Sequence, residues 1–171
     1  MLHDAFAGLQ KLMLPDRWQA LALQGLRAGR DVIVSAPTGA GKTYVFERWV
    51  EQTAFARRAL FTVPTRALAN DKFAEWRARG WEVGIMTGDL CVRPEAPVVV
   101  ATLEAVQGRI VDGVGGTGEE PFRLLAVDEY HWLADAHRGN HYEGVLFSAP
   151  RDLQLLLLSG AVANPEDVAA W

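Results

Sequence analysis

Short, continuous apolar runs alternate along this chain with stretches that carry apolar residues at helical spacing. The runs are rich in Val, Ile and Leu, and several are only four to six residues long. Continuous apolar strands, in contrast to alternating ones, are typical of a parallel sheet that is covered on both faces. The runs predict strands at residues 31–35, 59–63, 81–87, 97–102, 124–127 and 153–159.

Helical periodicity fills most of the chain between these runs. Asp16 and Thr65 stand where helix N-caps are expected. Asn164 as N-cap and Pro165 at the first helical position predict the start of a further helix. The glycine-rich stretch 112–120 predicts a surface loop. Alternating strands and helices predict an α/β domain of three layers around a mostly parallel sheet. Helices are predicted at residues 2–13, 16–27, 42–56, 65–79 and 103–111.

The composition of the chain argues against several classes of protein. A chain of 171 residues suits one domain, and 50% hydrophobic residues exclude a disordered chain. The net charge of -4 argues against a protein that coats nucleic acid through general basicity, although it allows a local groove. The single cysteine, Cys91, excludes an internal disulfide. No apolar run reaches 18 residues, so we expect no membrane association and a cytoplasmic location.

The segment "SAPTGAGKT" joins the first predicted strand to a helix and has the spacing of a phosphate-binding loop. Gly39 and Gly41 allow a tight turn of N–H groups towards a phosphate, Lys42 adds a positive charge, and the Thr43 hydroxyl is a ligand for Mg²⁺. Ala36 departs from the generic pattern, which begins with glycine. The alternative is a plain glycine-rich turn. The predicted ATP-binding residues here are Pro37, Thr38, Gly39, Ala40, Gly41, Lys42 and Thr43.

Two adjacent carboxylates, Asp128 and Glu129, end the apolar run that begins at Leu124. Ligands of α/β sheets bind at the carboxyl ends of strands, so Asp128 is placed to hold Mg²⁺ together with Thr43. Glu129 is then free to orient an attacking water molecule. The alternative is a solvated strand end with two ordinary acids.

The segments "APTGAGKT", "PTRALAN", "TGD", "ATLEAV" and "DEYH" follow one another in an order that resembles the first motor domain of superfamily 2 helicases. The resemblance is strongest to the DExH branch of superkiller-like and archaeal repair helicases, in which Asp135, Arg138 and Gly139 match a downstream motif. It implies a RecA-like P-loop NTPase domain over residues 1–171, with a helical lead-in over 1–30, that works with a second RecA-like domain absent from this chain.

The resemblance also implies roles around the nucleotide. Gln19 matches the glutamine that reads the adenine edge, and a glutamine amide offers the donor and the acceptor that adenine needs. His131 matches the histidine that relays the nucleotide state. The alternatives are an ordinary surface glutamine and a hydrogen-bonded core histidine. Trp18 fits the adenine pocket or the core. Gln19 is predicted to bind the nucleotide. The predicted catalytic residues are Lys42, Asp128, Glu129 and His131.

Three further segments match motifs that contact a single strand of DNA or RNA. Such contacts follow backbone phosphates without reading the sequence. Thr65 also fits a simple N-cap, and Arg66 also fits a solvated helix charge. The predicted nucleic-acid-binding residues are Pro64, Thr65, Arg66, Thr87, Gly88, Asp89 and Thr102.

One motif departs from the family. Where its members carry Ser-Ala-Thr, this chain has Ser159, Gly160 and Ala161, predicted to couple hydrolysis to strand separation. This chain lacks the threonine hydroxyl of that motif. Its absence favours an alternative to the helicase motor: a clamp or translocase on nucleic acid that ATP binding switches and that does not separate strands. A small-molecule kinase is a third possibility, which "PTRALAN" and the DExH-type acids disfavour.

Overall fold

The computed structural model describes residues 15–111, 120–134 and 139–160, together with residues 166, 168 and 170. The predicted helix over 2–13 and most of the predicted loop and terminal helix lie outside these residues. The helices are α2 (Arg17–Arg27), α3 (Lys42–Gln52), α4 (Arg66–Ala78), α5 (Leu103–Val111), the 3-10 helix η2 (Tyr130–Ala134) and α6 (Gly139–Ser148). The strands are β1 (Val32–Ser35), β2 (Ala59–Val63), β3 (Val83–Met86), β4 (Cys91–Val92), β5 (Val98–Thr102), β6 (Leu124–Asp128) and β7 (Gln154–Ser159).

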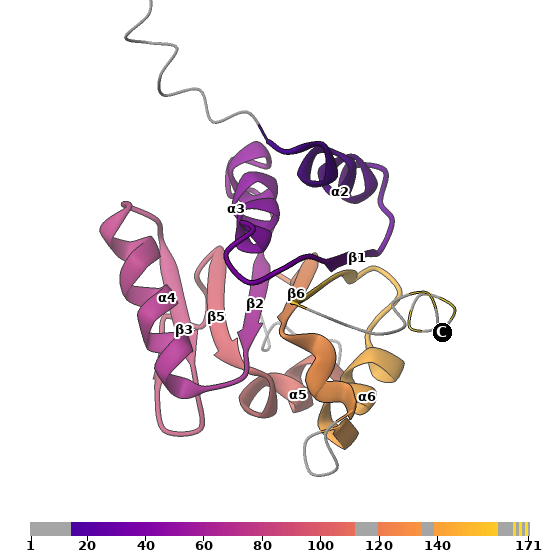
Figure 1. Ribbon diagram of the computed structural model, residues 1–171. Coiled ribbons are helices and arrows are strands. Elements are labelled where there is room, and N and C mark those ends of the chain that lie inside the picture. Colours follow the sequence, from indigo (N-terminus) through magenta and orange to yellow (C-terminus); the bar gives the residue numbers. More distant parts are fainter. Residues whose placement is uncertain are drawn as a thin grey trace, which may run out of the picture.

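The seven strands form one sheet in the order β1-β7-β6-β2-β5-β3-β4 (Figure 1). All neighbouring pairs are parallel except β3 and β4. The predicted parallel α/β architecture is therefore confirmed. The parallel pairing brings the carboxyl ends of six strands to one edge of the sheet and their amino ends to the opposite edge. None of the helices in the described ranges has the length and apolar character needed to cross a membrane.

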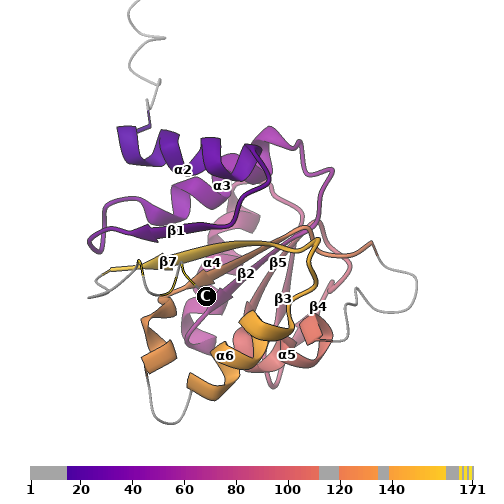
Figure 2. The same ribbon diagram turned by 90° about the vertical axis from the view of Figure 1, so that its right-hand side faces the viewer.

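Helices cover both faces of the sheet and make three layers. Figure 2 shows α2 and α3 on one side of the sheet and α5 and α6 on the other. Alternate residues of a strand point to opposite faces, so Ala126 belongs to the core under α2, α3 and α4 while Leu125 and Val127 belong to the core over α5 and α6. Both faces of β6 are therefore dry, which explains its continuous apolar sequence.

Helix α3 ends at Gln52, four residues before the predicted end. Ala54 and Phe55 adopt the left-handed conformation, with φ angles of 49° and 58°, and these angles stop the helix. The Phe55 ring meets Trp81 edge-on, with 5.1 Å between the ring centroids. The sequence predicted a longer helix because Phe55 stands at a helical spacing, although it packs against the core from the turn that follows α3.

Arg58 is a buried guanidinium at the amino end of β2, with 8% of its surface exposed. It donates hydrogen bonds to the carbonyl oxygens of Pro94, Ala96 and Glu120, and it lies over the Phe122 ring at 4.3 Å from the centroid. These bonds tie the start of β2 to the segments that enter β5 and β6. A carbonyl oxygen buried without a donor is costly, so the arginine holds this edge of the sheet together.

We predict that Arg58→Ala lowers the free energy of unfolding by about 2–4 kcal/mol, because three carbonyl groups lose their donor. Urea unfolding followed by tryptophan fluorescence measures the change. The neighbouring Arg57→Ala is the matched control, because the Arg57 side chain is exposed; its effect should stay within about 0.5 kcal/mol. Equal effects of the two substitutions would contradict a stabilising role for Arg58.

Candidate functional site

The phosphate loop leaves β1 and enters α3 with the geometry that its glycines allow. Gly39 and Gly41 both have a φ angle of 82°, which a residue with a side chain adopts only with strain. Gly41 is the N-cap of α3, so the first N–H groups of this helix have no partner within it. The loop therefore presents free N–H groups and the positive end of a helix dipole, which together attract a phosphate.

Lys42 is folded into this loop, with only 8% of its surface exposed. Its Nζ donates to the carbonyl oxygen of Ala36 at 3.0 Å and to that of Pro37 at 3.4 Å. A lysine ammonium has three donors and a flexible stem, so these carbonyl groups hold it in place while no phosphate is bound.

Gln19 reaches the same loop from α2. Its Nε2 donates to the Gly41 carbonyl oxygen at 3.1 Å, and its Oε1 accepts the Asp16 N–H at 2.8 Å. Each end of the amide makes one bond within the protein, which fixes the side chain and leaves the second N–H and the second lone pair of the amide for a ligand such as adenine. Trp18, the other candidate for the adenine pocket, packs against the hydrophobic core.

The carboxyl end of β7 lies between the phosphate loop and the paired acids. Ser159 of β7 pairs with Ser35 at the end of β1. On its other side, Leu158 pairs with Asp128 at the end of β6. Three neighbouring strands therefore bring the phosphate loop, the Ser-Gly motif and the acids to one edge. Ala161 lies outside the described residues.

Gly160 lies directly against the phosphate loop. A Cβ atom placed on it would lie 3.4 Å from Thr38 Oγ1 and 4.0 Å from Lys42 Nζ. An alanine at this position would bring its Cβ atom into van der Waals contact with the Thr38 side chain. Glycine here leaves the loop more room.

Asp128 carries an unfavourable charge in the absence of a cation. Burial raises the pKa of this carboxyl to about 6, and the negative charge of Glu129 contributes to the increase. The Glu129 N–H, which donates to Asp128 Oδ1 at 3.1 Å, and the ammonium groups of Lys42 and Lys72 partly offset the increase in the pKa. A divalent cation would relieve this repulsion, so the residues present fit the predicted metal site formed by Asp128 and Thr43.

Glu129 and His131 form a linked pair beyond the strand end. Glu129 has a φ angle of 54°, a left-handed conformation that costs about 1–3 kcal/mol for a residue with a side chain. His131 Nδ1 lies 3.1 Å from Glu129 Oε2 and 3.0 Å from Ser159 Oγ. A carboxylate only accepts, so Nδ1 must carry the proton that this contact uses. His131 thereby connects the predicted catalytic carboxylate to the end of β7.

The predicted nucleic-acid residues gather at the other half of the same sheet edge. Val63 at the end of β2 pairs with Thr102 at the end of β5, and β3 pairs with β5 on the far side. A cavity of about 460 Å³ opens there. It is lined by Pro64, Thr65, Arg66, Gly88, Thr102, Glu104 and Ala105. Five of these residues were predicted. Glu104 and Ala105 were missed, although they follow Thr102 in the quoted motif.

Two side chains beside this cavity hold each other. Arg66 Nη1 lies 3.2 Å from Asp89 Oδ2, and the Thr87 hydroxyl donates to Asp89 Oδ1 at 2.8 Å. These bonds lower the pKa of Asp89, with the Thr87 bond as the leading cause. Thr65 caps α4 by accepting the Leu68 N–H at 3.3 Å, so its predicted capping role is confirmed. The ion pair is exposed on both sides and is open to competition from a phosphate.

A phosphate loop and paired acids at the carboxyl edge of a parallel sheet define the class of P-loop nucleotide hydrolases. A sequence profile of the family described as DEAD/DEAH box helicase matches residues 16–168. The chain belongs to this family.

The relatives are DExH-box proteins. The chain is 37% identical over 163 residues to the chloroplastic DExH-box ATP-dependent RNA helicase DExH15 of Arabidopsis thaliana. The aligned region covers 91% of the chain and 14% of that protein. It is 36% identical over 159 residues to the probable helicase HelY of Mycobacterium tuberculosis, covering 91% of the chain and 17% of the relative. It therefore spans less than a fifth of either relative.

A solved structure supports the fold. The crystal structure of the DUF1998 helicase MrfA bound to DNA and AMPPNP aligns with a TM-score of 0.73, at 20% identity, over 95% of this chain and 26% of that chain. The three-layer RecA-like fold is confirmed by this likeness, and the resemblance to DExH helicases is confirmed by the relatives. The chain is thus a RecA-like domain of the DEAD/DEAH box helicase family.

Tyr130 stands between the predicted catalytic residues and is 1% exposed. Its hydroxyl has no hydrogen-bond partner among the described residues, and burial raises the pKa of the phenol. We predict that Tyr130→Phe raises the free energy of unfolding by about 1 kcal/mol, because it removes a buried hydroxyl that lacks a partner. Thermal and urea unfolding measure the difference. A loss of stability would show that the hydroxyl is hydrogen-bonded in solution.

We predict that Asp128→Asn stabilises the metal-free protein at pH 7.5 by about 1–3 kcal/mol. The ordinary pKa of aspartate, 3.8, applies to the unfolded chain, whereas the folded chain keeps the proton up to about pH 6. The unfolded state therefore binds fewer protons in this window, and the wild type loses stability as the pH rises through it.

Urea unfolding in a chelator at pH 4 and pH 7.5 tests this. The advantage of Asp128→Asn should be present at pH 7.5 and nearly absent at pH 4. Asp152→Asn, which removes an exposed carboxylate, is the control and should show no such pH dependence. A pH-independent gain, or a loss of stability at pH 7.5, would contradict the raised pKa.

Proposed function

We propose that the chain is the first motor domain of a helicase, binding ATP with Mg²⁺ on one half of the sheet edge and a single nucleic-acid strand on the other. The observation that carries this proposal is the strand order. The neighbouring β-strands β1, β7 and β6 carry the candidate nucleotide-binding residues. The neighbouring β-strands β2, β5 and β3 carry the candidate nucleic-acid-binding residues. Events at the nucleotide can therefore reach the bound strand across the contact between β6 and β2.

In the nucleotide half, the loop N–H groups and Lys42 bind the phosphates. Lys42 exchanges the Ala36 and Pro37 carbonyl oxygens for β- and γ-phosphate oxygens. Thr43 and Asp128 would hold Mg²⁺, which would neutralise charge that develops on the phosphates. Glu129 orients the attacking water molecule, and its bond to His131 fixes the direction of its carboxylate. Gln19 contacts the adenine.

In the strand-binding half, Arg66 supplies the charge. A phosphate of the strand displaces Asp89 from Arg66, and the Thr65 and Thr102 side chains with the N-terminal end of α4 complete the contact. Such contacts position the backbone of a DNA or an RNA strand and read no sequence.

Hydrolysis at a useful rate needs a second RecA-like domain. Arginines supplied across the nucleotide accelerate phosphoryl transfer by about 10³–10⁵-fold in related systems. This chain alone should bind ATP, hydrolyse it slowly and leave duplexes intact.

A clamp or translocase that ATP switches, without strand separation, is the second candidate. The structural observation in its favour is Gly160, which lies beside Thr38 and Lys42 of the phosphate loop and has no side chain to contact them. The sequence adds that Ala161 stands where the family motif has threonine. Strand displacement by the longer protein to which such a domain belongs would decide between the two.

We predict that Lys42→Ala and Arg66→Ala separate the two activities of the chain. Lys42→Ala should weaken binding of a fluorescent ATP analogue with Mg²⁺ by at least about tenfold, because it removes the ammonium from the phosphates. It should leave the affinity for a labelled oligo(U) or oligo(dT) strand unchanged. Arg66→Ala should weaken strand binding several-fold and reduce its salt dependence by about one phosphate contact, with unchanged nucleotide affinity.

Fluorescence anisotropy measures both affinities, and circular dichroism checks that each variant is folded. Arg77→Ala, at an exposed position of α4 away from the cavity, is the control for Arg66→Ala. If Arg66→Ala and Arg77→Ala weaken strand binding equally, the proposed strand-binding half is wrong. If Lys42→Ala leaves nucleotide binding intact, the proposed nucleotide half is wrong.

A further inference from the structure

Arginines stand just before four of the parallel strands. Arg30 lies before β1, Arg57 and Arg58 before β2, and Arg123 before β6, and Arg151 lies three residues before the start of β7. These four strands are consecutive in the sheet, in the order β1-β7-β6-β2. Because they are parallel, their amino ends meet at one edge, opposite the edge that carries the phosphate loop. A chain of net charge -4 thus collects arginines at one place.

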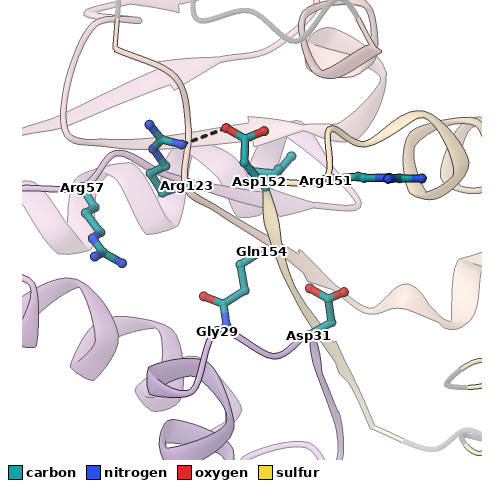
Figure 3. A pocket seen from close by; sticks show the side chains of 8 residues that line it. Gly29, Asp31, Arg57, Arg123, Arg151, Asp152 and Gln154 are labelled. Atoms are coloured by element: carbon teal, nitrogen blue, oxygen red, sulfur yellow. Dashed lines mark hydrogen bonds and ion pairs between the residues drawn. The ribbon is translucent and has the colours of Figure 1, made fainter.

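A cavity of about 550 Å³ opens at this arginine edge, within the size range of ligand sites. Its lining includes Arg57, Arg123 and Arg151, the carboxylates of Asp31 and Asp152, and the Gln154 amide. Figure 3 shows Arg57 and Arg123 to one side of Asp152 and Arg151 to the other. The positive charges are therefore spread along the cavity.

The polar groups between the arginines are already engaged. Asp31 Oδ1 accepts the Leu155 N–H at 2.8 Å, and Gln154 Nε2 donates to the Leu26 and Arg30 carbonyl oxygens. The latter bonds cover carbonyl groups at the carboxyl end of α2, which would otherwise repel an anion.

The guanidinium groups differ in what they contact. Arg123 pairs with Asp152 at 2.8 Å. Arg57 and Arg151 are exposed and make no hydrogen bond or ion pair with any residue in the described part of the chain. Arg58, by contrast, is buried against carbonyl oxygens and supports the fold. Two guanidinium forks thus face the cavity without partners, and such forks pair best with carboxylates or phosphates.

We propose that the arginine edge is a docking site for a short acidic segment of a protein, whose carboxylates pair with Arg57 and Arg151. The mixed lining favours a peptide over a nucleic-acid strand. The backbone N–H groups of a peptide can donate to the remaining oxygens of Asp31 and Asp152, whereas the sugar-phosphate backbone of a nucleic acid has no N–H donor for them. The site lies at the opposite edge from the nucleotide residues, so a segment bound here leaves them accessible.

The test uses the 171-residue chain and a fluorescein-labelled octaglutamate peptide, with affinity measured by fluorescence anisotropy at low salt. The variant Arg57→Glu with Arg151→Glu should weaken peptide binding by about tenfold or more, since two charged contacts become repulsive. The control, Arg48→Glu with Arg77→Glu, makes the same change of net charge at exposed positions of α3 and α4. It should change the affinity by less than about twofold.

Two results would overturn the proposal: peptide binding that is absent in the wild type, or equal weakening in both double variants, which marks a general charge effect. A labelled oligo(U) or oligo(dT) strand provides the third arm. If strand binding, and not peptide binding, depends on Arg57 and Arg151, the edge binds nucleic acid and the peptide proposal fails. Binding of the ATP analogue should be intact in every variant, so failure here is distinguishable from failure of the motor function.

Discussion

The parallel hydrogen bonding of β1, β7, β6, β2, β5 and β3 is the constraint on which the rest of the structure depends. Parallel pairing sends the carboxyl ends of all six strands to one edge, whatever their order along the chain. Residues as distant as Ser35 and Ser159 become direct neighbours in this way. With the strand order fixed, the phosphate loop, the acids and the motifs predicted to bind nucleic acid form one continuous row, and no long loop is needed to bring them together.

This arrangement places groups in the row that a stable fold alone would not select. Asp128 holds a charge at the end of a dry strand, and Glu129 follows it with a left-handed backbone. Lys42 lies buried against carbonyl oxygens instead of an acid. The buried charge of Asp128 costs stability, and a bound cation would reduce that cost. Strain and desolvation gathered at one edge are typical of a site prepared for a ligand.

The apolar runs and caps of the sequence contained most of the fold. Strands with two dry faces are almost continuously apolar, so β2, β5 and β6 were predicted within one residue of their observed ends. The two-residue strand β4 and helix α6 were missed. β4 has exposed residues, and neither element has a clear apolar pattern.

The candidate site was predictable in part. The phosphate loop and the acids are recognisable because their chemistry requires particular residues at fixed spacing. The strand order is set by packing between distant segments, so the sequence could not show that the Ser-Gly motif lies between loop and acids. The bond from Gln19 to the Gly41 carbonyl oxygen likewise depends on how α2 docks onto α3.

The opposite edge of the sheet shows how one sequence feature can have two physical causes. An arginine before a strand either satisfies carbonyl oxygens of the segments that enter the sheet or faces solvent at the sheet's edge. Arg58 does the first, because it is buried and donates to three carbonyl groups. Arg57, one residue earlier, points out of the same edge. Contacts within the protein therefore account for Arg58, and the ion pair with Asp152 accounts for Arg123. Arg57 and Arg151 make no hydrogen bond or ion pair within the described residues, and both line the open cavity, so their place beside it is consistent with the proposed ligand.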